Sequence, residues 1–301
     1  RPHELARAWP RLAVDGRGRV AVVDAAGGVC IEDAGTRRDL VVPSRATSVA
    51  LAERGPGLAV GLLDGSVLGF SAPDTAPQRW QLDGPVAQVW VVGALASVVA
   101  RTGSGTVVAL QPGSPEPTRL GAAAIDGECH DVRVVLHPIR SDTAAVLLGH
   151  EDAIVFHEAG RGATLRRPAG FSLEPAAAYG PGGRQFAVAL ADRRLLVLTD
   201  LEAAGREYTL PEDARAVAFV DEHELVAVGD SGSLIRLDLA IGEAVVVQHA
   251  WVRHPAAPTL VSVAADGVIR VDSVGSLASA RVDAVPRDPA GFLAWLAPRT
   301  R

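Results

Sequence analysis

The sequence predicts an all-β fold built from repeated four-stranded sheets. Three observations carry this prediction: the composition, a recurring hairpin pattern, and the spacing of that pattern. Of the 301 residues, 48% are hydrophobic and 21% charged, so the chain can bury a substantial core and is not expected to be disordered. Cys30 and Cys129 are too few and too far apart to predict a disulfide framework.

Pairs of aliphatic runs around a small or polar turn recur along the chain. "ELVAVGDSGSLIRLDL" begins at Glu224, and similar stretches begin near positions 19, 57, 95, 144, 185 and 260. This pattern is typical of β-hairpins. Each hairpin has one expected turn residue, and these are Gly28, Gly65, Gly105, Asp152, Arg193, Gly232 and Gly267. Their spacing of roughly 40 residues is the period of a four-stranded propeller blade.

Each repeat also has room for two further strands. Small residues precede the hairpin, as in "ATSVALA" at 46–52, and charged residues follow it, as in "TRRDLVVP" at 36–43. Small side chains suit a crowded centre, and charged ones suit a solvent-facing edge that must not pair with other chains. The sequence therefore predicts a seven-bladed β-propeller with four-stranded blades over residues 11–284.

Two segments flank the predicted propeller. Residues 1–10 are expected to form an N-terminal segment, a candidate link to an upstream domain. In residues 285–301, Asp288 and Pro289 are typical of a helix start. Phe292, Leu293, Trp295 and Leu296 then form an apolar helical stripe. We expect a short C-terminal helix packed on the propeller.

Gly229-Asp230-Ser231-Gly232 matches the sequence around the nucleophilic serine of chymotrypsin-like proteases. Its place in the repeat indicates instead the turn between the second and third strands of the sixth blade. A nucleophilic Ser231 would need a histidine base within reach. His223 is expected at the opposite end of the second strand, too distant for hydrogen bonding.

The hairpin spacing and four-strand rhythm resemble the WD40 repeat family in a degenerate form. Asp200 and Asp238 fall near the family's aspartate position, although no Trp-Asp dipeptide is present, and Gly149-His150 falls in a hairpin turn. The C-terminal tail resembles the segment that closes many bacterial WD-repeat proteins, which join propellers to signalling and defence domains. The resemblance implies the fold and a role in such a larger protein.

One long loop concentrates residues that can carry chemistry. Residues 121–131 contain Asp126, Glu128, Cys129, His130 and Asp131. These types can bind metals or form a Cys-His dyad. However, Cys129 and His130 are adjacent, and neighbours on an extended chain point to opposite sides. We interpret the loop as a partner-contacting segment and predict no catalytic residue, no metal site and no cofactor.

Polar residues at the turns and in this loop are predicted to ring one face as a protein-docking rim. They are Asp64, Arg101, Glu128, His130, Asp131, Glu151, Asp152, Arg193, Asp230 and Asp266. Aromatic side chains often anchor such interfaces. Trp80 and Trp251 would serve if exposed, although burial is the better expectation for each.

The function predicted is a non-catalytic protein-interaction or regulatory propeller, part of a larger bacterial signalling or defence protein. Its partner would be a protein or another domain of the same chain. Lys, Asn and Met are absent, as in chains from GC-rich genomes. The net charge of −6 and unclustered arginines argue against nucleic acid. No apolar run suits a membrane span, so a cytoplasmic location is expected. The alternative is a small-molecule-sensing or hydrolytic propeller using its central channel, against which the aliphatic first strands argue.

Overall fold

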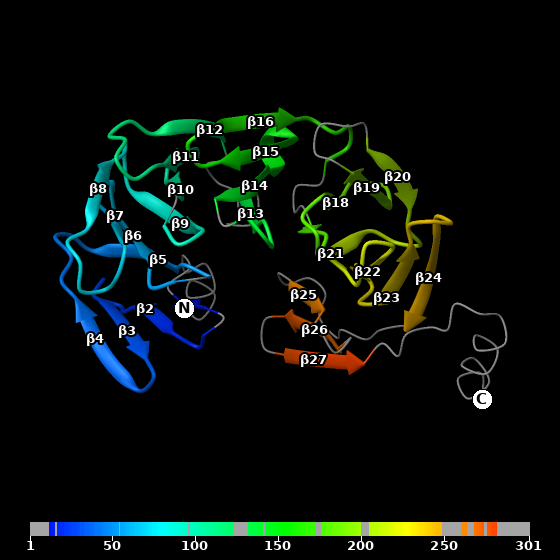
Figure 1. Cartoon of the computed structure of the whole chain (residues 1–301), viewed down its shortest axis with the longest axis horizontal. Helices are drawn as coiled ribbons and strands as arrows, with labels where there is room; N and C mark the ends of the chain where they lie inside the picture. The colour runs from blue at the N-terminus through cyan, green and yellow to red at the C-terminus, as the bar shows by residue number, and fades with distance from the viewer. Residues whose placement is uncertain are drawn as a thin grey trace. The chain divides into compact units, whose positions relative to one another are not determined.

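The predicted all-β fold is confirmed. The structure, a computed structural model, describes residues 12–15, 17–53, 55–95, 97–122, 132–140, 142–171, 176–199, 205–248, 260–263, 268–273 and 276–281. These residues form seven antiparallel sheets, six of them four-stranded (Figure 1). The chain divides into two compact units, Arg1–Pro175 and Ala176–Arg301.

The first unit contains four sheets, each built from strands that follow one another in sequence. The first sheet comprises β1 (Leu12–Val14), β2 (Val20–Val23), β3 (Val29–Asp33) and β4 (Thr36–Leu40). The second comprises β5 (Ala46–Leu51), β6 (Leu58–Leu62), β7 (Ser66–Phe70) and β8 (Gln78–Gln81). The third comprises β9 (Val86–Val92), β10 (Ser97–Thr102), β11 (Thr106–Leu110) and β12 (Thr118–Ala122). The fourth comprises β13 (Val132–Leu136), β14 (Thr143–Leu148), β15 (Ala153–Glu158) and β16 (Gly162–Arg166), with a single 3₁₀ turn, η1 (Gly149–Glu151), between β14 and β15.

The second unit contains three sheets of the same design. The fifth sheet comprises β17 (Ala177–Tyr179), β18 (Gln185–Ala189), β19 (Arg194–Thr199) and β20 (Arg206–Thr209). The sixth comprises β21 (Ala214–Phe219), β22 (Glu224–Gly229), β23 (Leu234–Asp238) and β24 (Glu243–Gln248). The last has three described strands, β25 (Leu260–Val263), β26 (Val268–Ser273) and β27 (Ser276–Arg281). The strand expected before β25 and the helix expected in 285–301 lie outside the described residues.

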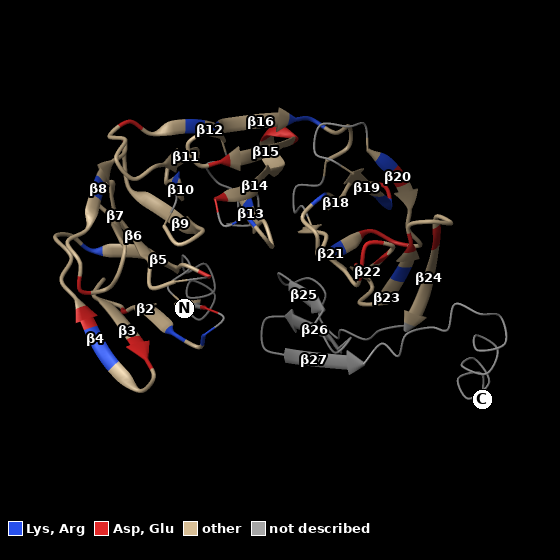
Figure 2. Cartoon of the chain, in the orientation of Figure 1, with Lys and Arg blue, Asp and Glu red and all other residues tan. Residues whose placement is uncertain are grey.

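The first strand β5 and the fourth strand β4 have the character predicted for such strands. The segment at 46–52 forms β5, which contacts β2 of the preceding sheet and β9 of the following one. The charged segment at 36–43 forms β4, in which four of five residues are exposed. Figure 2 shows charged residues on the fourth strands β4, β12 and β20. Charge on these edges discourages pairing with other chains.

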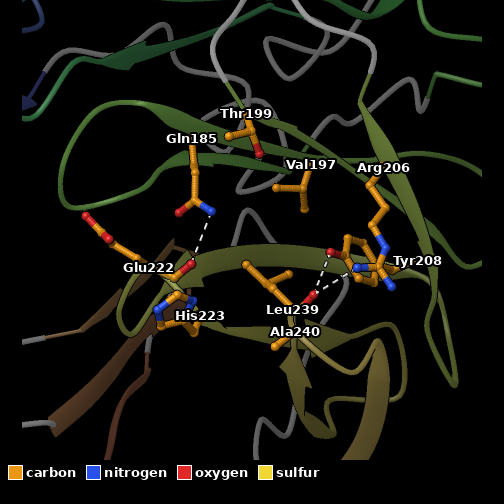
Figure 3. A pocket seen from close by; sticks show the side chains of 9 residues that line it. All are labelled: Gln185, Val197, Thr199, Arg206, Tyr208, Glu222, His223, Leu239 and Ala240. Carbon is orange, nitrogen blue, oxygen red and sulfur yellow. Dashed lines mark hydrogen bonds between the residues drawn. The ribbon is translucent and has the colours of Figure 1, made fainter.

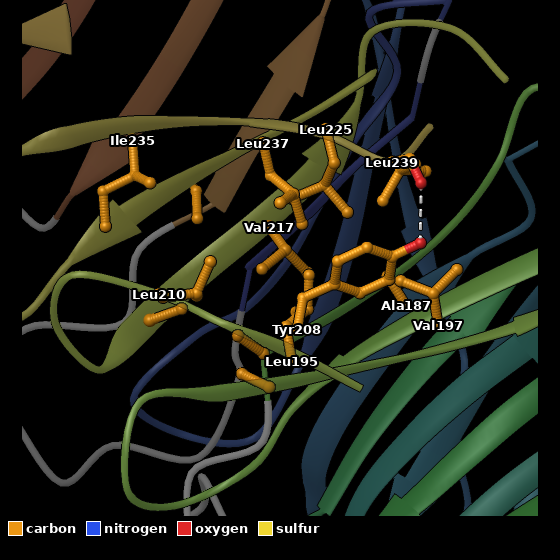
Figure 4. Packing of buried hydrophobic residues seen from close by; sticks show 14 of the residues in the cluster. Ala187, Leu195, Val197, Tyr208, Leu210, Val217, Leu225, Ile235, Leu237 and Leu239 are labelled. Carbon is orange, nitrogen blue, oxygen red and sulfur yellow. Dashed lines mark hydrogen bonds between the residues drawn. The ribbon is translucent and has the colours of Figure 1, made fainter. Parts of the chain in front are cut away.

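The second and third strands form the interior of each unit. Every residue of β22 is buried, and it pairs with β23 from Glu224 opposite Asp238 to Val228 opposite Leu234. Leu225 and Leu237 of the sixth sheet form one hydrophobic cluster with Leu195 and Tyr208 of the fifth sheet, as Figure 4 shows. The residues that alternate with Leu225 along β22 pack on the opposite face of the sheet, in a separate cluster. Burial on both faces explains why these strands are continuous apolar runs in the sequence.

Candidate functional site

The candidate site is the set of turns between the second and third strands. Five of the predicted turn residues have left-handed backbones, with φ of 87° at Gly65, 87° at Gly105, 51° at Asp152, 59° at Arg193 and 81° at Gly232. These conformations place a bend where a regular strand would otherwise continue.

In the first sheet, Gly28 lies in the turn between β2 and β3, as predicted. The left-handed residue of this turn is the neighbouring Gly27, with φ of 88°. The Gly28 N–H instead donates to the Asp24 carboxylate at 2.8 Å. Adjacent glycines have equal conformational freedom, so the sequence could not separate them. The seventh turn residue, Gly267, lies outside the described residues.

The connection from one sheet to the next is hydrogen-bonded to the turns of both sheets. Between the first and second sheets, the Ala46 N–H donates to the Gly27 carbonyl at 2.9 Å. One residue earlier, the Arg45 carbonyl accepts from the Leu63 N–H at 2.9 Å. A single short loop thereby holds two successive turns in place.

The same bonding recurs twice more. Between the second and third sheets, the bonds run from Leu82 N–H to the Gly65 carbonyl at 2.9 Å and from Gly103 N–H to the Pro85 carbonyl at 2.7 Å. Between the fifth and sixth sheets, they run from Leu210 N–H to the Arg193 carbonyl at 2.7 Å and from Asp230 N–H to the Asp213 carbonyl at 2.9 Å. The turn face of each unit is therefore a bonded framework rather than a set of independent loops.

The Gly-Asp-Ser-Gly segment belongs to this framework, and its turn assignment is confirmed. Ser231 binds Glu212, a residue of the connection before the sixth sheet, through two bonds. The Ser231 N–H donates to Oε2 at 2.7 Å and the hydroxyl donates to Oε1 at 2.9 Å. Gly229 leaves the space that the Glu212 side chain occupies, because a Cβ there would collide with it.

In the described part of the chain, the Ser231 hydroxyl has no hydrogen bond to a histidine. The only described hydrogen-bond partners of its hydroxyl are Glu212 and, at 2.7 Å, the Ser233 hydroxyl. His223 precedes β22, and the six residues of that strand separate it from the turn. At about 3.3 Å per residue the separation is roughly 20 Å, far beyond proton-transfer distance.

Two carboxyl groups of this cluster, those of Glu212 and Asp230, influence each other's pKa. A hydrogen bond to Glu212 raises the pKa of Asp230, and burial and the negative charges of Glu212 and Asp213 add to the effect. Burial by itself raises the pKa of Glu212, but hydrogen bonds from Ser231, Asp230 and Ser233 outweigh it and lower that pKa overall. The contact between Asp230 and Glu212 therefore shifts the pKa values of the two carboxyl groups in opposite directions.

The structure brings Arg193 and Asp230 to the same connection of the second unit. The Arg193 N–H donates to the Asp213 carboxylate at 2.6 Å, and the Asp213 carbonyl accepts from Asp230. Both Arg193 and Asp230 are exposed. The prediction of a polar turn face is consistent with these two positions.

The first unit places three predicted rim residues at its turns. Asp64 is exposed; the Ser66 N–H donates to it at 2.9 Å, and this bond lowers the pKa of Asp64. Asp152 is exposed, whereas Glu151 is half-buried and accepts from the Ala122 N–H at 2.8 Å. Glu151 thus fastens β12 to η1 as well as contributing charge.

Arg101 does not lie at a turn. It occupies β10, opposite Gln88 and Val107, and only 4% of the residue is exposed. The bend is formed by the next polar residues, "TGSG", so the strand continues through Arg101. Its polarity suggested a turn, but the hydrogen-bonded ladder decides where the strand ends.

One predicted anchor is buried, and several other predicted positions lie outside the described residues. Trp80 is 2% exposed and its indole N–H donates to the Ser114 carbonyl at 3.1 Å, so it is a core residue. Outside the described residues lie the rim positions Glu128, His130, Asp131 and Asp266, the loop residues Asp126 and Cys129, and Trp251.

A buried serine-histidine pair was not anticipated from the sequence. Ser97 of β10 and His157 of β15 are 0% and 1% exposed, and the Ser97 hydroxyl lies 3.0 Å from His157 Nε2. Burial lowers the pKa of His157. The pair bridges two neighbouring sheets and is closed to solvent, which makes it a packing feature. The two residues are 60 positions apart, so no local pattern indicates their contact.

A cavity on the second unit was also missed. It has a volume of about 250 Å³ and lies between the fifth and sixth sheets, at the strand ends opposite the β22–β23 turn (Figure 3). Its lining residues are Gln185, Val197, Thr199, Arg206, Tyr208, Glu222, His223, Leu239 and Ala240. They come from five separate segments, none of which carries a recognisable motif.

The described residues contain no group of three or more His, Cys, Asp or Glu side chains arranged to hold a metal ion. Among the same residues, no helix has the length and apolar character needed to cross a membrane.

Comparison with known proteins identifies the fold. No known protein family matches the sequence, and no curated protein does. A solved chain of the mitotic checkpoint complex has 13% sequence identity and a TM-score of 0.58, with 92% of this chain and 87% of that chain covered. The β-propeller domain of Myceliophteria thermophila Cps50 (Swd1) has 14% identity and a TM-score of 0.54, with 91% and 97% covered. The protein therefore has a β-propeller fold.

Proposed function

We propose that this protein is a non-catalytic interaction module that binds a protein, or another domain of its own chain, on the turn face. The observation that carries the proposal is the framework in which three connections between sheets are each bonded to two successive turns. A surface already held in place loses little conformational entropy on binding. Exposed charges at Asp64, Asp152, Arg193 and Asp230 supply specificity on that surface.

The turn face of the second unit favours a partner segment with basic side chains. Glu212, Asp213 and Asp230 lie within one hydrogen-bonded group there. Opposite charges across an interface accelerate encounter and reject partners of the wrong sign.

The wider setting is part of the proposal. We infer that the module belongs to a larger bacterial signalling or defence protein and acts in the cytoplasm. Support comes from the absence of Lys, Asn and Met and from the resemblance of the C-terminal tail to the closing segment of bacterial WD-repeat proteins. The low-identity structural matches support the fold and are neutral on this setting.

The proposal is tested by affinity capture from an extract of the source organism, with mass spectrometry to identify what is retained. One variant carries Asp64→Asn and Asp152→Asn, and a second carries Arg193→Asn and Asp230→Asn. Asp39→Asn on the outer strand β4 is the matched control. We expect a specific protein whose retention falls at least tenfold in one of the two variants and is unchanged in the control.

Two outcomes would contradict the turn face as the binding surface. The first is that wild-type protein enriches nothing over empty resin. The second is that both double variants retain every captured protein as well as the wild type does. Circular dichroism of each variant separates lost binding from lost folding.

A further inference from the structure

The cavity between the fifth and sixth sheets has a preorganised arginine at one side. The Arg206 guanidinium lies 4.9 Å from the centre of the Tyr208 ring, which holds it by a cation–π contact. Arg206 Nη1 donates to the Leu239 carbonyl at 3.3 Å, and the Tyr208 hydroxyl donates to the same oxygen at 2.9 Å. The guanidinium is therefore held by two contacts before any ligand arrives.

No described carboxylate neutralises Arg206. Glu207, the next residue on β20, pairs with Arg194 at 3.1 Å. The Asp238 carboxylate accepts from the Ala240 N–H at 2.9 Å and so caps its own turn. Figure 3 shows the Glu222 carboxylate pointing away from the other lining side chains, while its carbonyl accepts from Gln185 at 3.1 Å. Within the described part of the chain, the guanidinium keeps donors for a group that the protein does not supply.

The remaining walls have two characters. Val197, Leu239 and Ala240 offer apolar surface, whereas Thr199 and His223 offer polar groups. Volumes of about 300–1,000 Å³ are usual for drug-sized ligands, so a cavity of about 250 Å³ fits one inserted side chain better than a whole cofactor. The geometry selects a short aliphatic stem that ends in an acceptor for arginine.

We propose that this cavity binds a carboxylate on a short aliphatic stem, presented as a glutamate side chain by an acidic peptide segment. The carboxylate bonds to Arg206 in the forked geometry that guanidinium favours, and the stem lies against Val197 and Leu239. Because the cavity lies at the strand ends opposite the β22–β23 turn, this site is separate from the turn face and can act independently of it.

The experiment measures binding of three probes to the full chain by ligand-observed NMR. The first is an acetylated and amidated pentapeptide, Ala-Ala-Glu-Ala-Ala. The second carries Gln in place of Glu and a free C-terminal carboxylate, and the third is free glutarate. We expect saturable binding of the Glu peptide with a Kd of about 1 mM or below. We expect at least tenfold weaker binding of the Gln peptide.

Variants of the chain locate the site. Arg206→Gln removes the arginine, whereas Ala240→Trp fills the cavity and keeps the arginine. Each variant should weaken binding of the Glu peptide at least tenfold. Both positions are exposed, so the fold should tolerate these changes. Arg194→Gln, on the adjacent strand but outside the cavity, should leave binding unchanged. Variants of the turn face should also leave it unchanged, which keeps this test separate from that of the proposed function.

Three results would overturn the inference. One is the absence of Glu-peptide binding at 10 mM, a concentration about tenfold above the expected Kd. Another is binding that Arg206→Gln and Ala240→Trp leave intact. A third is that only glutarate binds, or only the peptide with the free C-terminus. The ligand would then be a small molecule or a chain end, and not an acidic side chain.

Discussion

At the scale of single residues, the turn positions depend on backbone conformations and close approaches that few side chains tolerate. Gly65 has φ of +87°, and a Cβ at this position would lie 2.7 Å from the Leu82 carbonyl oxygen and 2.8 Å from that of Gly84. The hydrogen bond from Leu82 N–H to the Gly65 carbonyl needs this approach. A glycine at this turn therefore serves both the bend and the connection to the next sheet.

Gly65→Ala is expected to destabilise the protein more than Gly113→Ala. Left-handed backbone strain costs of order 1–3 kcal/mol at either position, since Gly113 has φ of +82°. Only Gly65 adds a collision, because a Cβ at Gly113 meets nothing within 4 Å. Urea unfolding of the two variants measures the difference. Equal losses of unfolding free energy would show that close approach is not important at this turn.

The buried His157 predicts loss of stability in acid. Its folded-state pKa is lowered by burial, so the unfolded chain binds the proton more tightly. The contribution of this residue is complete above the usual pKa of about 6.5 and is lost as the pH falls through the lower folded-state value. Melting temperatures between pH 7.5 and 5 should fall for wild type more steeply than for His157→Gln. Parallel pH profiles would assign the acid sensitivity to other groups.

At the scale of elements, the second and third strands hold neighbouring sheets together. Leu225 of β22 is 0% exposed and belongs to the cluster shared by the fifth and sixth sheets. Its neighbours on β22 face the opposite side, into another cluster. The continuous apolar run of β22 thus supplies two sets of buried side chains, which alternate along the strand between its two faces.

Leu225→Ala is expected to cost about 2–5 kcal/mol of unfolding free energy, because it removes buried surface and leaves a cavity. The control is Ile241→Ala, at a position that is 68% exposed, for which about 0.5 kcal/mol or less is expected. Chemical denaturation with a fluorescence readout compares the two. A cost at Leu225 no larger than at Ile241 would contradict the packing described.

The hairpins and the outer and inner strands could be predicted because their signals are local. Two apolar runs around small and polar turn residues, within about fifteen positions, predict β22, β23 and their turn. Arg101 shows where this reasoning stops, since a polar residue beside a turn can still belong to the strand. Local sequence also does not decide which of the adjacent Gly27 and Gly28 takes the left-handed backbone in the β2–β3 turn.

At the scale of the whole molecule, charge decides which classes of partner are excluded. The chain has 35 acidic and 29 basic residues, for a net charge of −6. Nucleic-acid binding draws most of its affinity from neutralised phosphates. Fluorescence anisotropy with a labelled 20-mer DNA duplex at 150 mM salt should therefore detect no binding at micromolar protein. Salt-sensitive binding under these conditions would overturn this expectation.

Local patterns are enough to predict the repeat, the all-β class and the hairpin strands, because these depend on neighbours along the chain. The tertiary structure decided which side chains from different sheets meet. Ser97 reaches His157, Ser231 reaches Glu212, and Arg206 and Tyr208 reach Leu239. These contacts depend on the register between separate sheets, and no local pattern encodes that register. The cavity with its held arginine exists only because such distant segments are packed together.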